Sequence, residues 1–203
     1  MARGTSGKGR RRRRRERTSV PAGNRPGPRR ANRGGPDRHR HEAHGAVGPL
    51  GVAVITVSST RTEATDASGA ELRRLFEAAG HRPRFYRVVP DDVDSIRKAV
   101  RDALTTDGVD LVITSGGTGM GRKDVTLEAV EPLLEKRADG WSDVFRAVSR
   151  EEVGTGAFLT RSVAGVVGQK WVVCVPGSVG AVRTAARRLL LPEAEHMVWE
   201  LRR

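Results

Sequence analysis

The sequence predicts an α/β domain of three layers, in which a mostly parallel β-sheet is covered by helices on both faces. Short runs of β-branched apolar residues alternate with amphipathic helical patterns, a rhythm that is typical of βαβ units. The strand-like runs are apolar almost throughout, as expected for strands buried on both sides. Polar or glycine-rich segments follow several of these strands, at the sheet edge where ligands of such folds bind. The fold class therefore also predicts where the functional site lies.

The first half of the domain supplies three strands and two helices. The strands are predicted at residues 50–57, 84–89 and 109–114. Ser68 and Glu71 match a capping box at the start of a helix that ends at Gly80. Either Asp91 or Asp92 is expected to cap the helix that connects the second strand to the third.

The second half continues with helices and a pair of strands. Helical patterns are predicted at residues 126–136 and 141–148, and strands at residues 162–167 and 170–175. Gly168 and Gln169 form a plausible tight turn between these strands. A last helix is expected to begin at residues 176–178.

Charge divides the chain of 203 residues near residue 46. Residues 1–46 hold fifteen of the 37 Lys and Arg residues but only three of the 24 acidic ones, so they carry nearly all of the formal net charge of +13. They contain no aromatic residue and almost no large aliphatic one. We therefore expect a disordered, Arg-rich tail at residues 1–46, followed by one domain at residues 47–203.

The tail offers two further hypotheses about binding. The arginine run at residues 10–15 fits salt-dependent binding to nucleic acid, but no aromatic side chain is interleaved for base stacking. We expect a solvated segment and keep nucleic-acid binding by the tail as an alternative. His39, His41 and His44 have no supporting ligand shell in sequence, so they do not predict a metal site.

Neither export nor membrane insertion is predicted. No apolar stretch of roughly 7 to 15 residues, as a secretory signal requires, precedes Pro49. The apolar runs are also far shorter than the roughly 20 residues of a membrane span. Cys174, the only cysteine, has no partner and lies in an apolar run, which fits a reducing compartment. We expect a cytoplasmic protein.

The glycine-rich segment at residues 115–119 follows the third predicted strand directly. Glycines without Cβ atoms allow backbone N–H groups to point at a phosphate, so this segment predicts a phosphate-binding loop, with a plain glycine-rich turn as the alternative. Arg122 and Lys123 stand where a Walker motif has Lys and then Ser or Thr, and Arg122 also replaces the third glycine of a dinucleotide fingerprint. The loop is therefore neither a P-loop nor a dinucleotide-binding turn.

The residues around this loop resemble a known family. The glycine string at residues 116–119, followed by Asp124 and Thr126, is similar to the GGTG and Asp-x-Thr hallmark of the MoaB/Mog family of molybdenum-cofactor biosynthesis proteins. Further matches follow in the family's order at residues 66–69, 90–92, 145–146, 149–154, 161–165 and 176–178. The resemblance covers about residues 50–191, and residues 145–154 are closer to the MoaB branch than to the Mog branch.

The resemblance implies a MoaB/Mog-like fold of Rossmann-like topology and a reaction. Family enzymes bind molybdopterin and ATP and use Mg²⁺ to transfer AMP to the terminal phosphate of the pterin. A homotrimer or a dimer of trimers is implied as well, with a downstream molybdate-insertion protein as a further partner. A non-catalytic molybdopterin-binding or scaffold protein of the same pathway is the alternative that the sequence leaves open.

The resemblance also assigns roles to individual residues. Asp91 and Asp124 match the family's catalytic aspartates and are expected to position Mg²⁺ and phosphate. The residues expected to bind the substrates are Ser58, Gly116, Gly117, Thr118, Gly119, Ser162, Pro176, Gly177 and Ser178. Asp91 also fits a helix N-cap, and Ser162 and Ser178 also fit structural serines at a strand end and an N-cap.

Overall fold

The computed structural model describes residues 46–203, so the predictions about the tail lie outside the described part of the chain. Six strands form one sheet in the order β2-β1-β3-β6-β5-β4. They are β1 (Gly51–Val57), β2 (Arg82–Val89), β3 (Leu111–Ser115), β4 (Lys136–Arg137), β5 (Val163–Val167) and β6 (Lys170–Val175). The first four strands in that order pair in parallel, and β5 and β4 add antiparallel pairs at one edge. The predicted mostly parallel sheet is confirmed.

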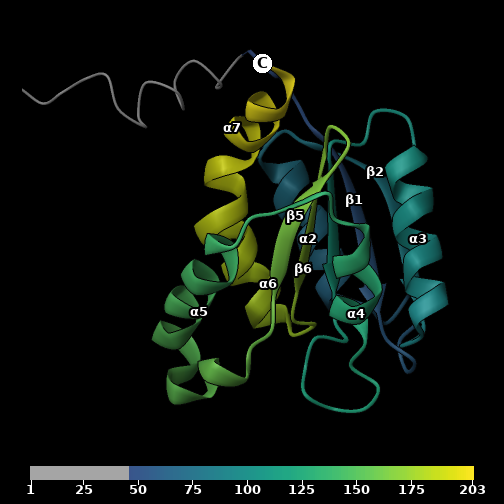
Figure 1. Ribbon diagram of the computed structural model, residues 1–203, viewed down its shortest axis with the longest axis vertical. Coiled ribbons are helices and arrows are strands. Elements are labelled where there is room, and N and C mark those ends of the chain that lie inside the picture. Colours follow the sequence, from purple (N-terminus) through teal and green to yellow (C-terminus); the bar gives the residue numbers. More distant parts are fainter. Residues whose placement is uncertain (1–45) are drawn as a thin grey trace, which may run out of the picture. The chain divides into compact units, whose positions relative to one another are not determined.

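Helices cover both faces of this sheet, as Figure 1 shows. They are α2 (Ala67–Ala78), α3 (Val93–Thr105), α4 (Thr126–Val130), α5 (Gly140–Val153), α6 (Val179–Ala185) and α7 (Leu191–Arg202). One core packs α3 and α4 against residues such as Ile55 and Val112, and the other packs α2, α5 and α6 against Val54 and Ile113. The strands alternate their side chains between these two cores, which confirms the predicted three layers.

The helix predicted at residues 126–136 is wrong in its length. α4 ends at Val130, a 3-10 helix occupies Glu131–Leu133, and β4 then begins. Pro132 explains the early end, because it has no N–H to bond to the carbonyl of Glu128 and its ring disfavours a helix interior. A second 3-10 helix follows α5 at Gly154–Leu159, and a π-helical turn at Ala186–Leu190 connects α6 to α7.

The structure shows which residues cap the first two helices. α2 is capped by Asp66, whose Oδ1 accepts from Gly69 N at 3.0 Å, so the predicted capping by Ser68 is wrong. α3 is capped by Asp92, whose Oδ2 accepts from Ser95 N at 2.8 Å. The alternative cap, Asp91, is therefore left for another role.

Other predicted elements are confirmed within one or two residues at most boundaries. β5 and β6 form the expected hairpin, with Gly168 at a φ of 59° in its turn, and Ser178 caps α6. α5 is longer than predicted, because it runs to Val153 before Gly154 ends it with a φ of 63°. No helix within residues 46–203 is both long and apolar enough to cross a membrane.

Asp66 does more than cap α2, because it ties three elements of the fold together. It is buried and accepts hydrogen bonds from Thr56 Oγ1 (2.6 Å), Ser68 Oγ (2.8 Å), Gly69 N (3.0 Å) and Tyr86 Oη (2.9 Å). Burial alone would raise the pKa of the Asp66 carboxyl, but these hydrogen bonds outweigh burial and lower it. The carboxylate therefore stays charged while it connects the end of β1, the start of α2 and the middle of β2.

We predict that Asp66→Asn lowers the free energy of unfolding at pH 7 by about 2 to 3 kcal/mol, because an amide cannot accept all four hydrogen bonds of the carboxylate. A carboxyl whose pKa is lowered in the folded state stabilises the protein above its unfolded pKa and loses that contribution as the pH falls through the folded pKa. The difference between variant and wild type should therefore shrink below about pH 4. Urea denaturation at a series of pH values measures it.

Asp107→Asn is the matched control, because Asp107 is an exposed aspartate in the turn after α3. It should leave the free energy of unfolding nearly unchanged at every pH. A loss in Asp66→Asn that stays constant between pH 7 and the acid range would contradict the role given to the charge.

Candidate functional site

The glycine loop, residues 116–119, begins where β3 ends and passes close to the end of β1. Gly116 has a φ of 104° and Gly117 a φ of 60°, conformations that residues with a Cβ atom rarely adopt. A Cβ atom placed at Gly116 would lie 2.3 Å from the carbonyl oxygen of Val57, so only glycine fits there. The N–H of Gly116 donates to the carbonyl of Val175 at 3.0 Å, which joins the loop to β6 as well.

Thr126, the last residue of the Asp-x-Thr segment, fixes the loop from the other side. Its Oγ1 donates to the carbonyl of Gly116 at 2.8 Å, and its N–H donates to the carbonyl of Gly117 at 2.9 Å. The Thr126 side chain is completely buried. The spacing between the glycines and this threonine therefore has a structural cause, since the threonine closes the loop.

The next three N–H groups of the loop are left without internal partners. Within residues 46–203, the backbone N–H groups of Gly117, Thr118 and Gly119 make no hydrogen bond to protein atoms. Successive unpaired N–H groups in a turn form a concavity that suits an anion. The arrangement supports the predicted phosphate-binding loop over a plain glycine-rich turn.

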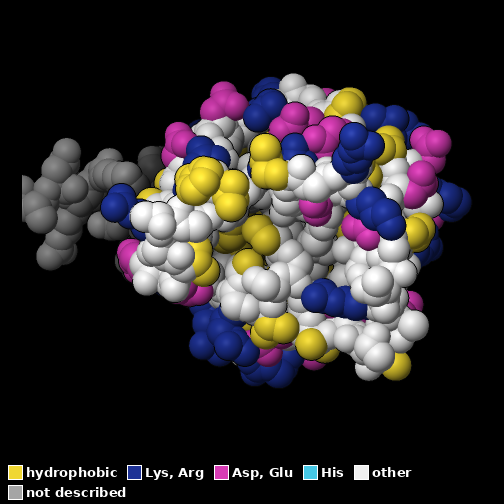
Figure 2. All heavy atoms as spheres, turned by 90° about the horizontal axis from the view of Figure 1, so that it is seen from below, with side chains coloured by type: hydrophobic (Ala, Val, Ile, Leu, Met, Phe, Trp, Pro, Cys, Tyr) yellow, Lys and Arg dark blue, Asp and Glu magenta, His cyan; other side chains and the backbone are white. Residues whose placement is uncertain are grey.

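The residues that carry these N–H groups line a cavity of about 390 Å³ at the carboxyl ends of the parallel strands. Figure 2 views the molecule from this side and shows a hollow among backbone and polar surface. The sequence-predicted residues that line the cavity are Ser58, Gly116, Gly117, Thr118, Gly119, Asp124, Pro176 and Gly177. Segments that lie far apart in the sequence therefore meet at one place, as the fold class predicts.

Asp124 is held directly against the glycine loop. Its Oδ2 accepts from the N–H of Gly121 at 2.9 Å, and a Cβ atom placed at Gly119 would lie 2.8 Å from the same oxygen. Oδ1 has no hydrogen-bond partner among the described residues. One carboxylate oxygen of Asp124 thus orients the side chain, and the other is available to a ligand.

Asp91 flanks the loop beside Gly117, just outside the cavity lining. Its Oδ2 accepts from the N–H and from the Oγ of Ser59, both at 2.7 Å, and its own N–H donates to Ser59 Oγ at 3.1 Å. A Cβ atom placed at Gly117 would lie 3.3 Å from Asp91 Oδ1. As with Asp124, that second oxygen has no partner within residues 46–203.

The two aspartates do not belong to a larger cluster of metal ligands. Among residues 46–203, no group of three or more His, Cys, Asp or Glu side chains is placed to hold a metal ion. Mg²⁺, however, is commonly held by one or two carboxylates together with substrate phosphates and water. Two carboxylates beside the glycine loop fit that kind of site, and they do not fit an all-protein metal cage.

Two predicted binding serines have structural partners. Ser162 is buried, and its Oγ donates to the carbonyl of Cys174 at 2.5 Å and accepts from Trp141 Nε1 at 2.6 Å. It does not line the cavity. Ser178 caps α6 by accepting from Ala181 N at 3.1 Å, and it lines a smaller neighbouring cavity of about 160 Å³.

Sequence reasoning assigned no role to Arg161, which connects the glycine loop to the Asp-x-Thr segment. Its Nε donates to the carbonyl of Thr118 and its Nη2 to the carbonyl of Asp124, both at 3.0 Å. Its Nη1 lies 2.6 Å from Glu128 Oε1, and this hydrogen bond lowers the pKa of Glu128. Arg161 belongs to a segment that carries the family resemblance, but nothing in its local pattern marks it as a clamp.

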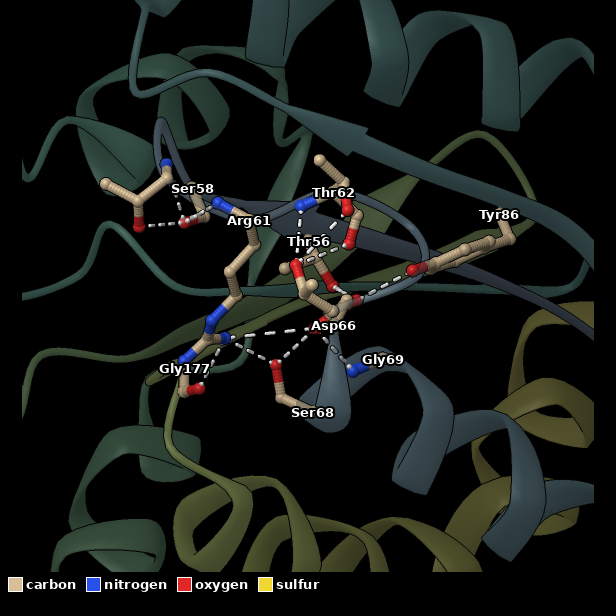
Figure 3. A network of polar contacts seen from close by, with 11 residues as sticks. Thr56, Ser58, Arg61, Thr62, Asp66, Ser68, Gly69, Tyr86 and Gly177 are labelled. Atoms are coloured by element: carbon tan, nitrogen blue, oxygen red, sulfur yellow. Dashed lines mark hydrogen bonds and ion pairs between the residues drawn. The ribbon is translucent and has the colours of Figure 1, made fainter.

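Arg61 was also missed, and it reaches across the cavity from the loop after β1. Its Nη1 donates to Ser68 Oγ at 2.8 Å and to the carbonyl of Gly177 at 3.1 Å, as Figure 3 shows. The partners are 7 and 116 residues away in the sequence. No pattern of spacing could have indicated the second contact.

Comparisons with known proteins agree with this geometry. Residues 53–196 match a family model described as "Probable molybdopterin binding domain". Molybdenum cofactor biosynthesis protein B of Bacillus cereus is 46% identical over 151 residues, which cover 74% of this chain and 89% of that protein. The matched range of the family model contains the glycine loop and both aspartates.

Solved structures show the same similarity in three dimensions. A crystal structure of a molybdenum cofactor biosynthesis protein B has a TM-score of 0.75 and 44% identity, covering 77% of this chain and 98% of that one. The tungsten cofactor synthesizing protein MoaB from Pyrococcus furiosus has a TM-score of 0.69 and 36% identity, covering 76% and 98%. The similarity thus extends over nearly the full length of the two solved structures.

We predict that Thr126→Val lowers the free energy of unfolding by about 1 to 3 kcal/mol, because it keeps the side-chain shape but leaves the carbonyl of Gly116 without its hydrogen bond. Thr126→Ser keeps the hydroxyl and should lose less. Chemical denaturation of both variants measures the difference. A loss in Thr126→Ser larger than that in Thr126→Val would mean that packing of the methyl group, which valine keeps, closes the loop rather than the hydrogen bond.

Proposed function

The chain belongs to the MoaB/Mog family of molybdenum-cofactor biosynthesis proteins, and on this basis we propose that it binds molybdopterin and transfers AMP to it from Mg-ATP. The observation that supports the proposal most strongly is the row of unpaired N–H groups at Gly117, Thr118 and Gly119, set between two carboxylates. Both substrates carry phosphate, and their reaction joins the two phosphates by a phosphoanhydride bond.

The proposed transfer is a substitution at phosphorus. An oxygen of the terminal phosphate of molybdopterin attacks the α-phosphorus of ATP, and a new P–O bond forms. The bond from the α-phosphorus to the oxygen that bridges to the β-phosphate breaks, so pyrophosphate leaves with that electron pair. The protein contributes mainly by aligning the two phosphates and neutralising their charge.

Each part of the cavity has a role in this proposal. The unpaired N–H groups of the glycine loop bind phosphate oxygens, and Thr126 and Arg161 keep the loop in the shape that presents them. The oxygens of Asp91 and Asp124 that have no partner within residues 46–203 would hold the divalent cation. When bound, Mg²⁺ neutralises the triphosphate and makes pyrophosphate a better leaving group.

A binding protein without turnover is the second candidate, and the position of Asp91 favours it. Asp91 lies outside the cavity lining, and one of its oxygens is occupied by Ser59. A chain with this cavity could bind molybdopterin and pass it to a partner without transferring AMP. The two candidates agree on the ligand and differ in whether the carboxylates act on it.

We predict that the purified protein converts molybdopterin and Mg-ATP to adenylylated molybdopterin and pyrophosphate. Asp124→Asn should lower the rate at least about a hundredfold, because it removes a charge that acts on the transferring group, and should change molybdopterin affinity much less. Chromatographic detection of the adenylylated pterin, together with pyrophosphate release, measures the rate.

The exposed Asp107→Asn variant again serves as the control and should keep the wild-type rate. Removal of divalent cations with a chelator should stop the transfer, and added Mg²⁺ should restore it. If the wild-type protein binds molybdopterin but transfers no AMP under conditions that support another family enzyme, the binding function stands and the transferase function is wrong.

A further inference from the structure

Two arginines line the cavity, and their guanidinium groups are used differently. Arg61 comes from the loop after β1, and Arg161 from the segment before β5. Among residues 46–203, they are the only Lys or Arg side chains that line it. A phosphate in this cavity would bind a cationic side chain whose N–H donors are not already used by the protein.

The guanidinium nitrogens of Arg161 are already hydrogen-bonded within the protein. All three of its guanidinium nitrogens donate hydrogen bonds, to the backbone carbonyls of Thr118 and Asp124 and to the carboxylate of Glu128. Its ion pair with Glu128 is tight, at 2.6 Å. A phosphate could recruit Arg161 only by breaking contacts that hold the loop together.

Arg61 is in the opposite situation. Only its Nη1 makes hydrogen bonds, to Ser68 and Gly177, and within residues 46–203 its Nε and Nη2 have no partner. About a third of its side chain is exposed, at 36%. Its nearest carboxylate is Asp66, at the looser distance of 3.8 Å. Most of the fork of N–H donors that suits phosphate is therefore available.

The position of Arg61 is nevertheless fixed. Ser68 Oγ accepts from Arg61 and donates to Asp66, so the buried carboxylate holds the guanidinium through the serine (Figure 3). Gly177 fixes the other side, next to the glycine loop. A Cβ atom placed at Gly177 would lie 2.9 Å from the Cα of Gly116 and 3.9 Å from Arg61 Nη1. The arginine head is thus held beside the first glycine of the loop.

We propose that Arg61 is the ligand-facing cation of this cavity and binds a phosphate group of a substrate, with Ser68 as its positioning residue. The inference rests on the proposed function for its ligands, but not on turnover. The bound group is either the pyrophosphate part of the nucleotide or the phosphate monoester of the pterin, which share the chemistry that Arg61 recognises. A purely structural tether between the loops after β1 and β6 is the competing explanation.

The test measures binding without catalysis. Wild type, Arg61→Gln, Arg61→Lys and the control Arg101→Gln are titrated by phosphorus NMR with inorganic pyrophosphate plus Mg²⁺, and separately with methyl phosphate. Arg101 is exposed on α3, so its variant removes the same charge away from the cavity. Thermal unfolding of each variant establishes that the proteins compared are folded.

Arg61→Gln should weaken binding of at least one of the two probes by about ten- to a hundredfold, the usual size of a charge-assisted hydrogen bond to phosphate. Arg61→Lys should recover part of the loss, and Arg101→Gln should bind like wild type. The probe that loses affinity identifies the phosphate that Arg61 binds. If neither loses more than about twofold, or if wild type binds neither probe, the proposal is wrong.

A double-mutant cycle tests whether Ser68 acts through Arg61. Ser68→Ala should weaken the same probe, and the double variant Ser68→Ala with Arg61→Gln should bind no more weakly than Arg61→Gln alone. Independent, additive losses would mean that Ser68 does not act through Arg61. Because no AMP transfer enters these measurements, they can support the role of Arg61 in a protein that proves to be only a binding protein.

Discussion

The close approach of three loops at Gly116 is the constraint on which the site depends. The loops after β1, β3 and β6 come together there, since a Cβ atom at Gly116 would meet the Val57 carbonyl at 2.3 Å and one at Gly177 would meet the Cα of Gly116 at 2.9 Å. Such contacts are open only to glycine. Gly116 is fixed in this way, and Thr126 closes the loop behind it. The N–H groups of the next three residues, which line the cavity, have no partner within residues 46–203.

Much of the fold was predictable because single segments determine it. Residues 51–57 and 111–115 are buried in every position, and their apolar runs can satisfy that burial only as central strands. The glycine loop was predictable for a similar reason, since its conformation depends on local backbone freedom. The end of α4 shows where local patterns conflict: the apolar spacing continued, but Pro132 could not continue the helix, and the proline prevailed.

The residues that sequence reasoning missed depend on contacts over long distances in the chain. Ser68 matched a capping box, yet Asp66 caps α2, and Thr56 and Tyr86, which belong to neighbouring strands, also donate to it. Arg61 and Arg161 are two of 37 basic residues, and their partners lie 116 and up to 43 residues away. Only the folded sheet brings these groups together. The sequence alone therefore cannot distinguish either arginine from basic residues that are simply solvated.

The arrangement of charge around the cavity gives the two kinds of ligand different places. Asp66 is fully buried and saturated with hydrogen bonds, so a substrate cannot reach it, but its charge still holds Arg61 through Ser68. At 3.8 Å this pairing is loose and leaves most of the arginine's donors open, whereas the pair of Arg161 and Glu128 at 2.6 Å does not. Asp91 and Asp124 are each tied by one oxygen to a backbone N–H, and the other oxygen of each has no partner within residues 46–203. In the proposed reaction, phosphates therefore meet the donors of Arg61, and the divalent cation meets the two aspartates.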